Sequence, residues 1–147
     1  MLFAQMLSIK DVWGCEFEKI KVVKGKESLL RVYGKIECPA HVLISTFTYI
    51  HKHVEGVPSL PLGASVMFSF WQGMNDQAKS HMGMLASACP TFRLLCIVQK
   101  GSGVSMATVA RTLKGYNFPR MLCVKMFTVT ASGSNEQFQA YICLKAP

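Results

Sequence analysis

The stretch Gln137-Phe-Gln-Ala-Tyr-Ile-Cys-Leu-Lys145 alternates apolar and polar residues with a period of two. Phe138, Ala140, Ile142 and Leu144 fall on one face, which is typical of a half-buried β-strand. The apolar run Met121–Thr130 comes before it, and Ser132-Gly133-Ser134-Asn135 between them has the composition of a hairpin loop. These residues predict two antiparallel strands joined by a hairpin.

The same β pattern recurs upstream along the chain. Leu29–Cys38 alternates in the same way, and β-branched and aromatic residues favour four further strands. These further strands are predicted at Phe17–Val23, Val42–Ile50, Ala64–Trp71 and Phe92–Gln99. We therefore predict a mainly β protein, an antiparallel β-sandwich or jelly-roll-like fold, in which residues 1–147 form one domain. The apolar segment Met1–Leu7 is interpreted as part of this fold.

Two segments have helical spacing. In Asn75–Cys89 the apolar residues recur at helical intervals, Asn75 or Asp76 can cap the start, and Pro90 prevents continuation. Gly83 is the one residue in it that disfavours a helix. In Ser105–Lys114, Ser105 can serve as N-cap and Gly115 suits the position after the end. A strand over residues 104–110 is the competing interpretation of the second segment.

The charge distribution is strongly uneven. Residues 77–135 contain seven Lys and Arg and no Asp or Glu, so nearly all of the net charge of +8 comes from this stretch. A sustained positive potential attracts polyanions, and single-stranded nucleic acid is the predicted partner, with an anionic membrane surface as the alternative. The predicted phosphate contacts are Lys79, Arg93, Lys100, Arg111, Lys114, Arg120 and Lys125. Tyr116, with Trp71 as a second candidate, is predicted to stack on bases, although Tyr116 and Phe118 could equally be core residues.

The acidic residues are too few and too scattered for paired-carboxylate chemistry or for a carboxylate-bound metal, and no motif predicts a cofactor. His51-Lys52-His53, with His41 or His81 as a third ligand, is the one metal-like cluster, and we interpret it as exposed histidines at a strand end. Lys100-Gly101-Ser102-Gly103 could bind a phosphate through free N–H groups, or it is a plain turn. Six cysteines without paired spacing predict reduced thiols. No apolar run reaches the length of a membrane span.

From Gly63-Ala-Ser-Val-Met-Phe-Ser-Phe70 through Thr91-Phe-Arg-Leu-Leu-Cys-Ile-Val98 to Arg120-Met-Leu-Cys-Val-Lys-Met-Phe127, the order of elements resembles the viral movement proteins of the thirty-kilodalton type. That resemblance implies a jelly-roll-like β core, sequence-tolerant binding of single-stranded nucleic acid and association with membranes. The sequence departs from the family in its hallmark aspartate, because residues 64–72 contain none and Asp76 lies out of place.

The hypothesis that follows is a non-enzymatic viral-type protein that binds single-stranded nucleic acid in the host cytoplasm. A role in cell-to-cell movement and assembly into a homo-oligomer are both compatible with this hypothesis. The first alternative is a structural, coat-type jelly-roll subunit whose apolar strands form interfaces between copies. A third hypothesis is an enzyme with a cysteine nucleophile and His41, His51, His53 or His81 as its base.

Overall fold

The computed structural model describes residues 11–16, 18–21, 23–24, 27, 46–101, 104–130 and 135–147. The chain separates into two compact units, Met1–Val57 and Pro58–Pro147, and each is described by itself. The single domain expected from the sequence stays a prediction. The predicted strand Leu29–Cys38, the segment Met1–Leu7 and His41 lie outside the described residues.

The first unit contains two parallel strands. β1 (Asp11–Glu16) pairs with β2 (Thr46–His51), and the short 3-10 helix η2 (Val54–Gly56) follows. The predicted strand at 17–23 is wrong, because its described residues 19–21 and 23 are helical. The Lys21 ammonium pairs with the Glu18 carboxylate at 2.6 Å, and such a pair three residues apart favours a helical turn.

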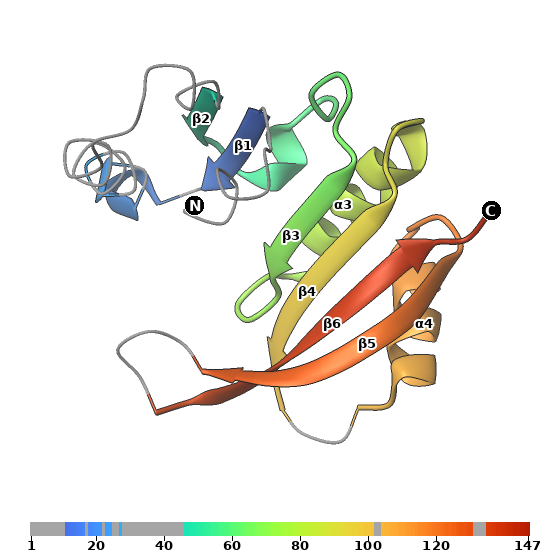
Figure 1. Cartoon of the computed structure of the whole chain (residues 1–147). Helices are drawn as coiled ribbons and strands as arrows, with labels where there is room; N and C mark the ends of the chain where they lie inside the picture. The colour runs from blue at the N-terminus through green and yellow to red at the C-terminus, as the bar shows by residue number, and fades with distance from the viewer. Residues whose placement is uncertain are drawn as a thin grey trace, which may run out of the picture. The chain divides into compact units, whose positions relative to one another are not determined.

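The second unit is a four-stranded sheet with two helices (Figure 1). Its strands follow the order β3-β4-β6-β5 across the sheet. β4 pairs with β3 in parallel, and β6 pairs antiparallel with both β4 and β5. The elements are β3 (Val66–Phe70), α3 (Asp76–Ala88), β4 (Leu94–Lys100), α4 (Met106–Gly115), β5 (Met121–Thr130) and β6 (Gln137–Lys145).

This arrangement contradicts the antiparallel sandwich or jelly roll expected from the sequence. The strands at β3, β4, β5 and β6 do form close to the predicted positions, but they form one mixed sheet. Parallel neighbours need a long crossover connection, usually a helix, and α3 is that crossover between β3 and β4. The helices are therefore a layer of the fold, where the sequence interpretation had treated them as insertions in a β core.

Both predicted helices are confirmed, together with their N-caps. The Asn75 side chain accepts a hydrogen bond from the N–H of Ala78 at 2.7 Å, and the Ser105 hydroxyl accepts one from Thr108 at 3.1 Å. The competing strand at 104–110 is wrong. Gly115 is the last residue of α4, one position earlier than predicted. Among the described residues, no helix is both long enough and apolar enough to span a bilayer.

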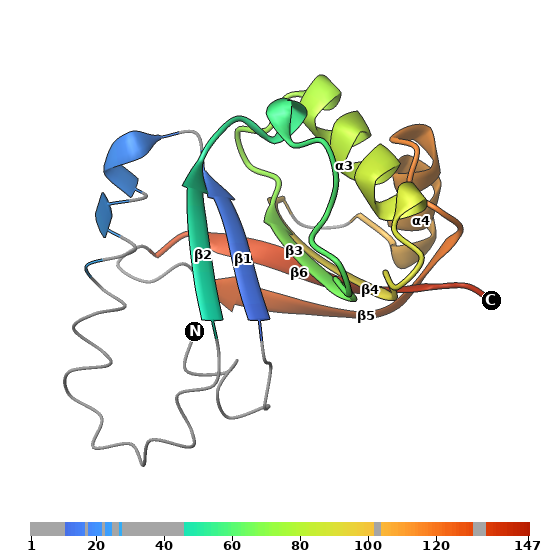
Figure 2. The ribbon, with the colours of Figure 1, turned by 90° about the horizontal axis from the view of Figure 1, so that it is seen from above.

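The main core lies between the sheet and the helices, which cover the same face of the sheet (Figure 2). The sheet contributes Leu95, Ile97 and Tyr141, all fully buried, and α4 contributes Leu113. In α3 the predicted apolar positions are buried. Burying a large aliphatic side chain such as Leu or Met stabilises a fold by about 1.5–3 kcal/mol. The buried α3 residues are Ala78, Met82, Gly83, Leu85 and Ala86.

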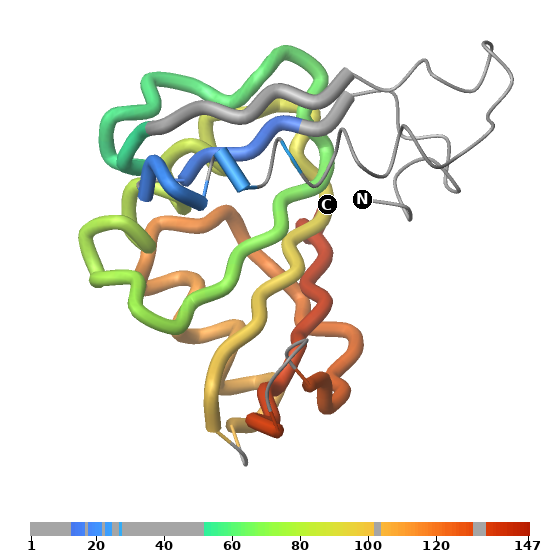
Figure 3. The backbone as a smooth tube through the Cα atoms, turned by 90° about the vertical axis from the view of Figure 1, so that its left-hand side faces the viewer, coloured from blue at the N-terminus to red at the C-terminus, as the bar shows by residue number. Residues whose placement is uncertain are grey.

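The opposite face of this sheet carries exposed apolar side chains. Val66 and Phe68 of β3 are 60% and 66% exposed, and Leu122 of β5 and Leu144 of β6 are 48% and 40% exposed. β4 and β6 run side by side along the middle of the sheet (Figure 3). At the far end of this face a small cluster of Val98, Phe138 and Ala140 is buried. Only one face of the sheet is thus packed against helices of this unit.

The two helices are joined by a close backbone contact at Gly83. A Cβ atom at this position would lie 1.8 Å from the carbonyl oxygen of Tyr116 and 2.7 Å from the nitrogen of Phe118. Asn117 between them has a positive φ of 62°, a conformation that Asn tolerates better than most residues. The glycine that disfavoured a helix in the sequence is therefore the residue that lets α3 approach the end of α4.

Candidate functional site

The candidate site lies at the carboxyl end of β3, where the chain turns into α3. The N–H of Trp71 donates to the carbonyl oxygen of Val98 at 2.8 Å, so the strand pairing with β4 continues one residue past β3. Asn75 then caps α3, which fixes the first turn of the helix beside this loop. Open sheets with parallel strands bind their ligands outside the carboxyl ends of the strands. Trp71 stands at such a position.

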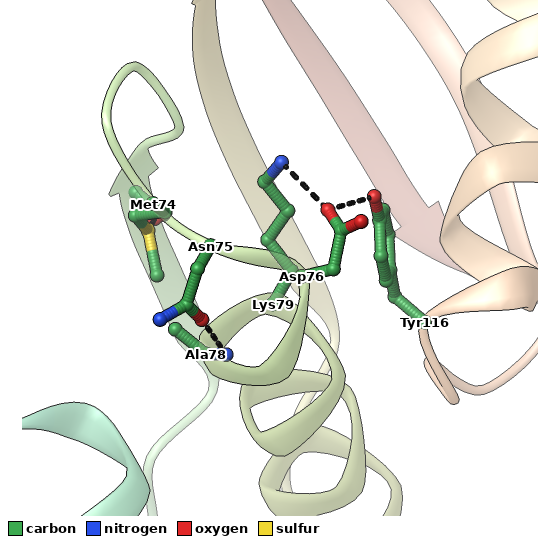
Figure 4. A network of polar contacts seen from close by, with 7 residues as sticks. Met74, Asn75, Asp76, Ala78, Lys79 and Tyr116 are labelled. Atoms are coloured by element: carbon green, nitrogen blue, oxygen red, sulfur yellow. Dashed lines mark hydrogen bonds and ion pairs between the residues drawn. The ribbon is translucent and has the colours of Figure 1, made fainter.

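A polar network joins α3 to the end of α4 (Figure 4). The Tyr116 hydroxyl donates to Asp76 Oδ1 at 2.7 Å, and the Lys79 ammonium lies 3.3 Å from the same oxygen. Lys79 Nζ also lies 5.6 Å from the centroid of the Trp71 ring and 5.4 Å from that of Tyr116. Both distances suit a cation–π interaction. Asp76 and Tyr116 are 40 residues apart in sequence, so this network forms only in the folded unit.

The network shifts the proton affinities of its members in opposite directions. The hydrogen bond from Tyr116 and then that from Lys79 lower the pKa of the Asp76 carboxyl. The bond to Asp76 in turn raises the pKa of the Tyr116 phenol. The Asp76 carboxylate is therefore present at neutral pH, and its bonds are lost only when the pH falls through its lowered folded-state pKa. The phenol keeps its proton above the pH at which a free tyrosine loses it.

Replacing Asp76 with Asn is expected to lower the pKa of Tyr116 toward its ordinary value, because the anion that favours the protonated phenol is gone. The shift can be followed through the ¹³Cζ resonances of the tyrosine rings in a pH titration. Glu136→Gln is the matched control, because it removes the first carboxylate after residues 77–135, which contain no Asp or Glu. It should leave the pKa of Tyr116 unchanged. An identical Tyr116 pKa in the wild type and Asp76→Asn would contradict the network.

Trp71 is the centre of an aromatic cluster under this network. Trp71 is 6% exposed, and its ring meets Tyr116 edge-on, with 5.6 Å between centroids and 88° between planes. The Phe118 ring lies 6.5 Å from that of Trp71, tilted by 38°. Tyr116 and Phe118 could each have been a base-stacking ring or a core residue. Phe118 is a core residue, whereas Tyr116 is half-buried and its hydroxyl binds Asp76.

A cavity of about 230 Å³ lies beside Trp71, between β4 and α4. Its walls are mostly apolar, and Gln99, Thr108 and Thr112 contribute polar groups. The indole Nε1 of Trp71 is buried and has no hydrogen-bond partner among the described residues. Buried polar groups are almost always paired, so this donor is an exception among the described residues.

The predicted phosphate contacts are distributed over several surfaces of the second unit. Lys79 is the most enclosed, with a side chain 17% exposed, and it is paired with Asp76. Lys100 ends β4 and lies 2.8 Å from Glu136. Asp76 and Glu136 are the acidic residues on either side of residues 77–135, which contain no Asp or Glu. In the fold, each of these two carboxylates forms an ion pair with a lysine of that stretch.

The other predicted contacts lie apart from one another. Arg93 and Arg120 precede β4 and β5, which run in the same direction, so both lie at the amino ends of these strands, opposite Lys100. Arg111 and Lys114 are exposed on α4, and Lys125 pairs in register with Ile142 in the sheet. The structure brings together Lys79 and Tyr116 of the predicted set. Phosphate binding by the remaining residues stays a prediction.

The cysteine thiols differ in their chemistry. Burial, with Cys123 close by, raises the pKa of Cys143 to about 12, and burial raises those of Cys15 and Cys96 as well. At Cys89 burial works in the same direction, but the hydrogen bond shared with the Thr91 hydroxyl and the bonds from nearby N–H groups outweigh it and lower the pKa. The thiolate is the nucleophile, so Cys15, Cys96 and Cys143 are poorly suited to nucleophilic catalysis.

Sequence reasoning named Trp71, Lys79 and Tyr116 by residue type but missed Asp76 as a site residue. The spacing of Asp76 and Lys79, three residues apart in a predicted helix, was the available signal for their pairing. Gln99, Thr108 and Thr112 carried no signal, because their approach to Trp71 depends on how α4 packs on β4.

No protein-family model and no curated protein sequence matches this chain. A solved structure with a similar fold is that of the magnesium protoporphyrin IX methyltransferase from Synechocystis PCC 6803 with bound S-adenosylmethionine. The two chains superpose with a TM-score of 0.62 at 11% sequence identity. The match covers 92% of this chain and 59% of the methyltransferase, so this chain spans less than two thirds of that protein's length.

This likeness corrects four expectations from the sequence. The fold is similar to that of a solved methyltransferase structure, so the jelly roll is wrong and the resemblance to viral movement proteins, which depended on a β core, is wrong with it. The coat-type alternative loses its basis in the same way. The expectation of a non-enzymatic nucleic-acid-binding protein is contradicted too, because a solved structure with a similar fold is that of a methyltransferase. The chain is similar in fold to an S-adenosylmethionine-bound methyltransferase.

Proposed function

We propose that this chain is part of a methyltransferase that uses S-adenosylmethionine. The observation that carries the proposal is the fold likeness to a methyltransferase with this molecule bound, which extends over 92% of the chain at a TM-score of 0.62.

S-Adenosylmethionine consists of an adenine base, a ribose with two hydroxyls and a methionine with a positively charged sulfur. The cavity beside Trp71, at about 230 Å³, is smaller than the roughly 300–1,000 Å³ of typical ligand pockets, and no charged side chain lines it. It does not fit the whole cofactor, and we assign it no part of the cofactor's binding.

Glu16 of the first unit has the chemistry needed to hold the ribose of S-adenosylmethionine. It ends β1, and an acidic residue after a parallel strand is the group that holds ribose hydroxyls in nucleotide-binding α/β folds. Oε1 of Glu16 accepts from the N–H of Glu18 at 3.1 Å, and Oε2 has no partner among the described residues. Oε2 could therefore accept from a ribose hydroxyl. When bound, the cofactor supplies an electrophilic methyl group.

Isothermal titration calorimetry of the chain with S-adenosylmethionine tests this proposal, and the wild type is expected to bind. Glu16→Gln should weaken binding by about tenfold or more, because hydrogen bonds to a charged group contribute roughly 1.5–3 kcal/mol. Glu18→Gln is the matched control, since the Glu18 carboxylate is engaged by Lys21. No binding by the wild type, or equal binding by Glu16→Gln, would refute it.

A further inference from the structure

Two cysteines of the second unit face each other across the hairpin of β5 and β6. Cys123 and Cys143 are direct partners in the antiparallel register of these strands, so their side chains lie on the same face of the sheet. Cys143 also pairs with the fully buried Leu95 of β4, which places this face toward the helices. Both thiols are free. The fold therefore brings together two groups that can react with each other.

The hydrogen bonds of this ladder determine how close the two cysteines are. In an antiparallel pair, hydrogen-bonded and non-hydrogen-bonded partners alternate along the strands. The N–H of Ala146 donates to the carbonyl oxygen of Arg120 at 2.8 Å, so residues 120 and 146 form a hydrogen-bonded pair. Alternation from there along the register makes Cys123 and Cys143 a non-hydrogen-bonded pair. Side chains approach more closely in such pairs than in hydrogen-bonded ones.

This pairing places the two thiols within the range that a disulfide requires. Partners without a hydrogen bond have Cα atoms about 4.5 Å apart, and disulfides join Cα atoms that are roughly 4.4–6.8 Å apart. Burial and then the neighbouring Cys123 raise the pKa of Cys143 to about 12, which agrees with two sulfur atoms in close proximity. Cys96 is in register with Ile142 and therefore belongs to the opposite face of the sheet. The pair thus consists of Cys123 and Cys143.

The two cysteines differ in their exposure. Cys143 is fully buried on β6, inside the sheet, whereas Cys123 is partly exposed on β5, an edge strand of the sheet. A small oxidant in solution therefore meets Cys123 first. Cys143 is shielded from solvent, so its nearest reaction partner is the sulfur of Cys123.

We propose that Cys123 and Cys143 form a redox modification site, at which a hydroperoxide such as hydrogen peroxide oxidises Cys123 and Cys143 then closes a cross-strand disulfide. The Cys123 sulfur attacks one oxygen of hydrogen peroxide, the O–O bond breaks, and Cys123 becomes a sulfenic acid while one water leaves. The Cys143 sulfur then displaces the hydroxyl from the Cys123 sulfur, and the Cys143 proton leaves with that hydroxyl as a second water. The two thiols lose two electrons, and the peroxide takes them up.

A β-bulge beside the site makes this modification reversible. The register shifts between Cys123 and Lys125, and bulges increase the local twist of a strand pair. A disulfide held away from its preferred geometry is strained and more easily reduced. While the bond exists, it joins the edge strand β5 covalently to β6, its neighbour in the sheet. The reaction involves no S-adenosylmethionine, so it is independent of the proposed methyltransferase function.

Peptide mapping of the full-length chain after peroxide treatment tests the proposal. The reduced chain is treated with hydrogen peroxide, its remaining thiols are blocked with N-ethylmaleimide in denaturant, and it is digested with trypsin. Trypsin separates the two cysteines, because it cleaves after Arg120, Lys125 and Lys145. Mass spectrometry is expected to find residues 121–125 joined to residues 126–145, with the mass of both peptides less two hydrogens. Dithiothreitol should restore the two separate peptides.

Cys96→Ser is the matched control, because it removes a thiol of the same sheet on the opposite face, and it should leave the link in place. Cys123→Ser should abolish the link and leave Cys143 fully blocked by N-ethylmaleimide. Added oxygen on residues 121–125 without a link would mean that Cys123 is oxidised alone. Unlinked, unoxidised peptides at a peroxide excess that oxidises methionines would mean that the oxidant does not reach Cys123. Either result would overturn the paired site.

Discussion

Replacing Gly83 with Ala is expected to destabilise the second unit by at least about 3 kcal/mol, more than most single substitutions. By helix propensity alone the change would stabilise α3 by up to about 1 kcal/mol, because Gly is a poor helix former. The added Cβ, however, would lie 1.8 Å from the Tyr116 carbonyl oxygen and 2.8 Å from the Asn117 carbonyl carbon. These are backbone atoms and cannot rotate away, so the steric effect dominates. Urea denaturation monitored by circular dichroism measures the loss.

Gly115→Ala is the matched control for this prediction. Gly115 also lies in a helix, at the end of α4, but a Cβ atom there would meet nothing within 4 Å. This substitution should be neutral or should stabilise the chain by about 0.4–1 kcal/mol, chiefly through the lower entropy of the unfolded chain. If Gly83→Ala proved as harmless as Gly115→Ala, the close approach of α3 to residues 116–118 would be wrong.

Tyr141→Ala is expected to cost about 3–5 kcal/mol, because it removes a fully buried ring from the core between β6 and the helices. Its hydroxyl also donates to the carbonyl oxygen of Val104 at 3.0 Å, which connects the sheet to the segment before α4. Tyr141→Phe separates the two contributions and should cost about 0.5–1.5 kcal/mol for the hydrogen bond alone. Both values come from the midpoints and slopes of urea denaturation curves.

Phe68→Ala is the control for Tyr141→Ala in the same sheet. Phe68 is an aromatic residue of β3, but its side chain is 66% exposed on the face without helices. Its removal should change the free energy of unfolding by no more than about 0.5 kcal/mol. A large loss at Phe68, or a small one at Tyr141, would reverse the assignment of the two faces of the sheet.

Local patterns in the sequence predicted the elements of the second unit well. The β5–β6 hairpin follows from alternation over Gln137–Lys145 and a short polar loop, and both helices follow from apolar spacing with Asn75 and Ser105 as caps. Hydrogen bonds and side-chain contacts within a few residues determine these features, so a single sequence contains their signal.

Strand pairing could not be predicted in the same way. Leu94–Val98 is a nearly continuous apolar run, which is typical of a parallel strand covered on at least one face, yet such a run also suits the core of a sandwich. The choice between these folds depends on whether α3 is a crossover connection, and that depends on contacts between distant residues. In the first unit, residues 19–21 are helical in a segment whose composition favoured a strand, and Lys21 is paired with Glu18.

The candidate site was predictable in residue type and unpredictable in role. The sequence singled out Lys79 and Tyr116 as separate contacts to a polyanion, but in the fold both are bound to Asp76. Trp71 was interpreted as a surface ring for stacking, but it is buried, and its Nε1 has no hydrogen-bond partner in the described part of the chain. Each correction comes from an approach between α3 and α4 or between α4 and β4, which no local pattern contains.

The position of β6 in the sheet has a consequence for synthesis of the chain. β6 is the last of the four strands to be translated, and it lies between β4 and β5, which have no direct pairing with each other. While a ribosome still holds residues 137–145, β5 has no neighbour in the sheet and β4 is paired on one edge only. The four-stranded sheet can therefore form only after β6 has left the ribosome. Until then, the unpaired edges of β4 and β5 are accessible to other nascent chains and to chaperones.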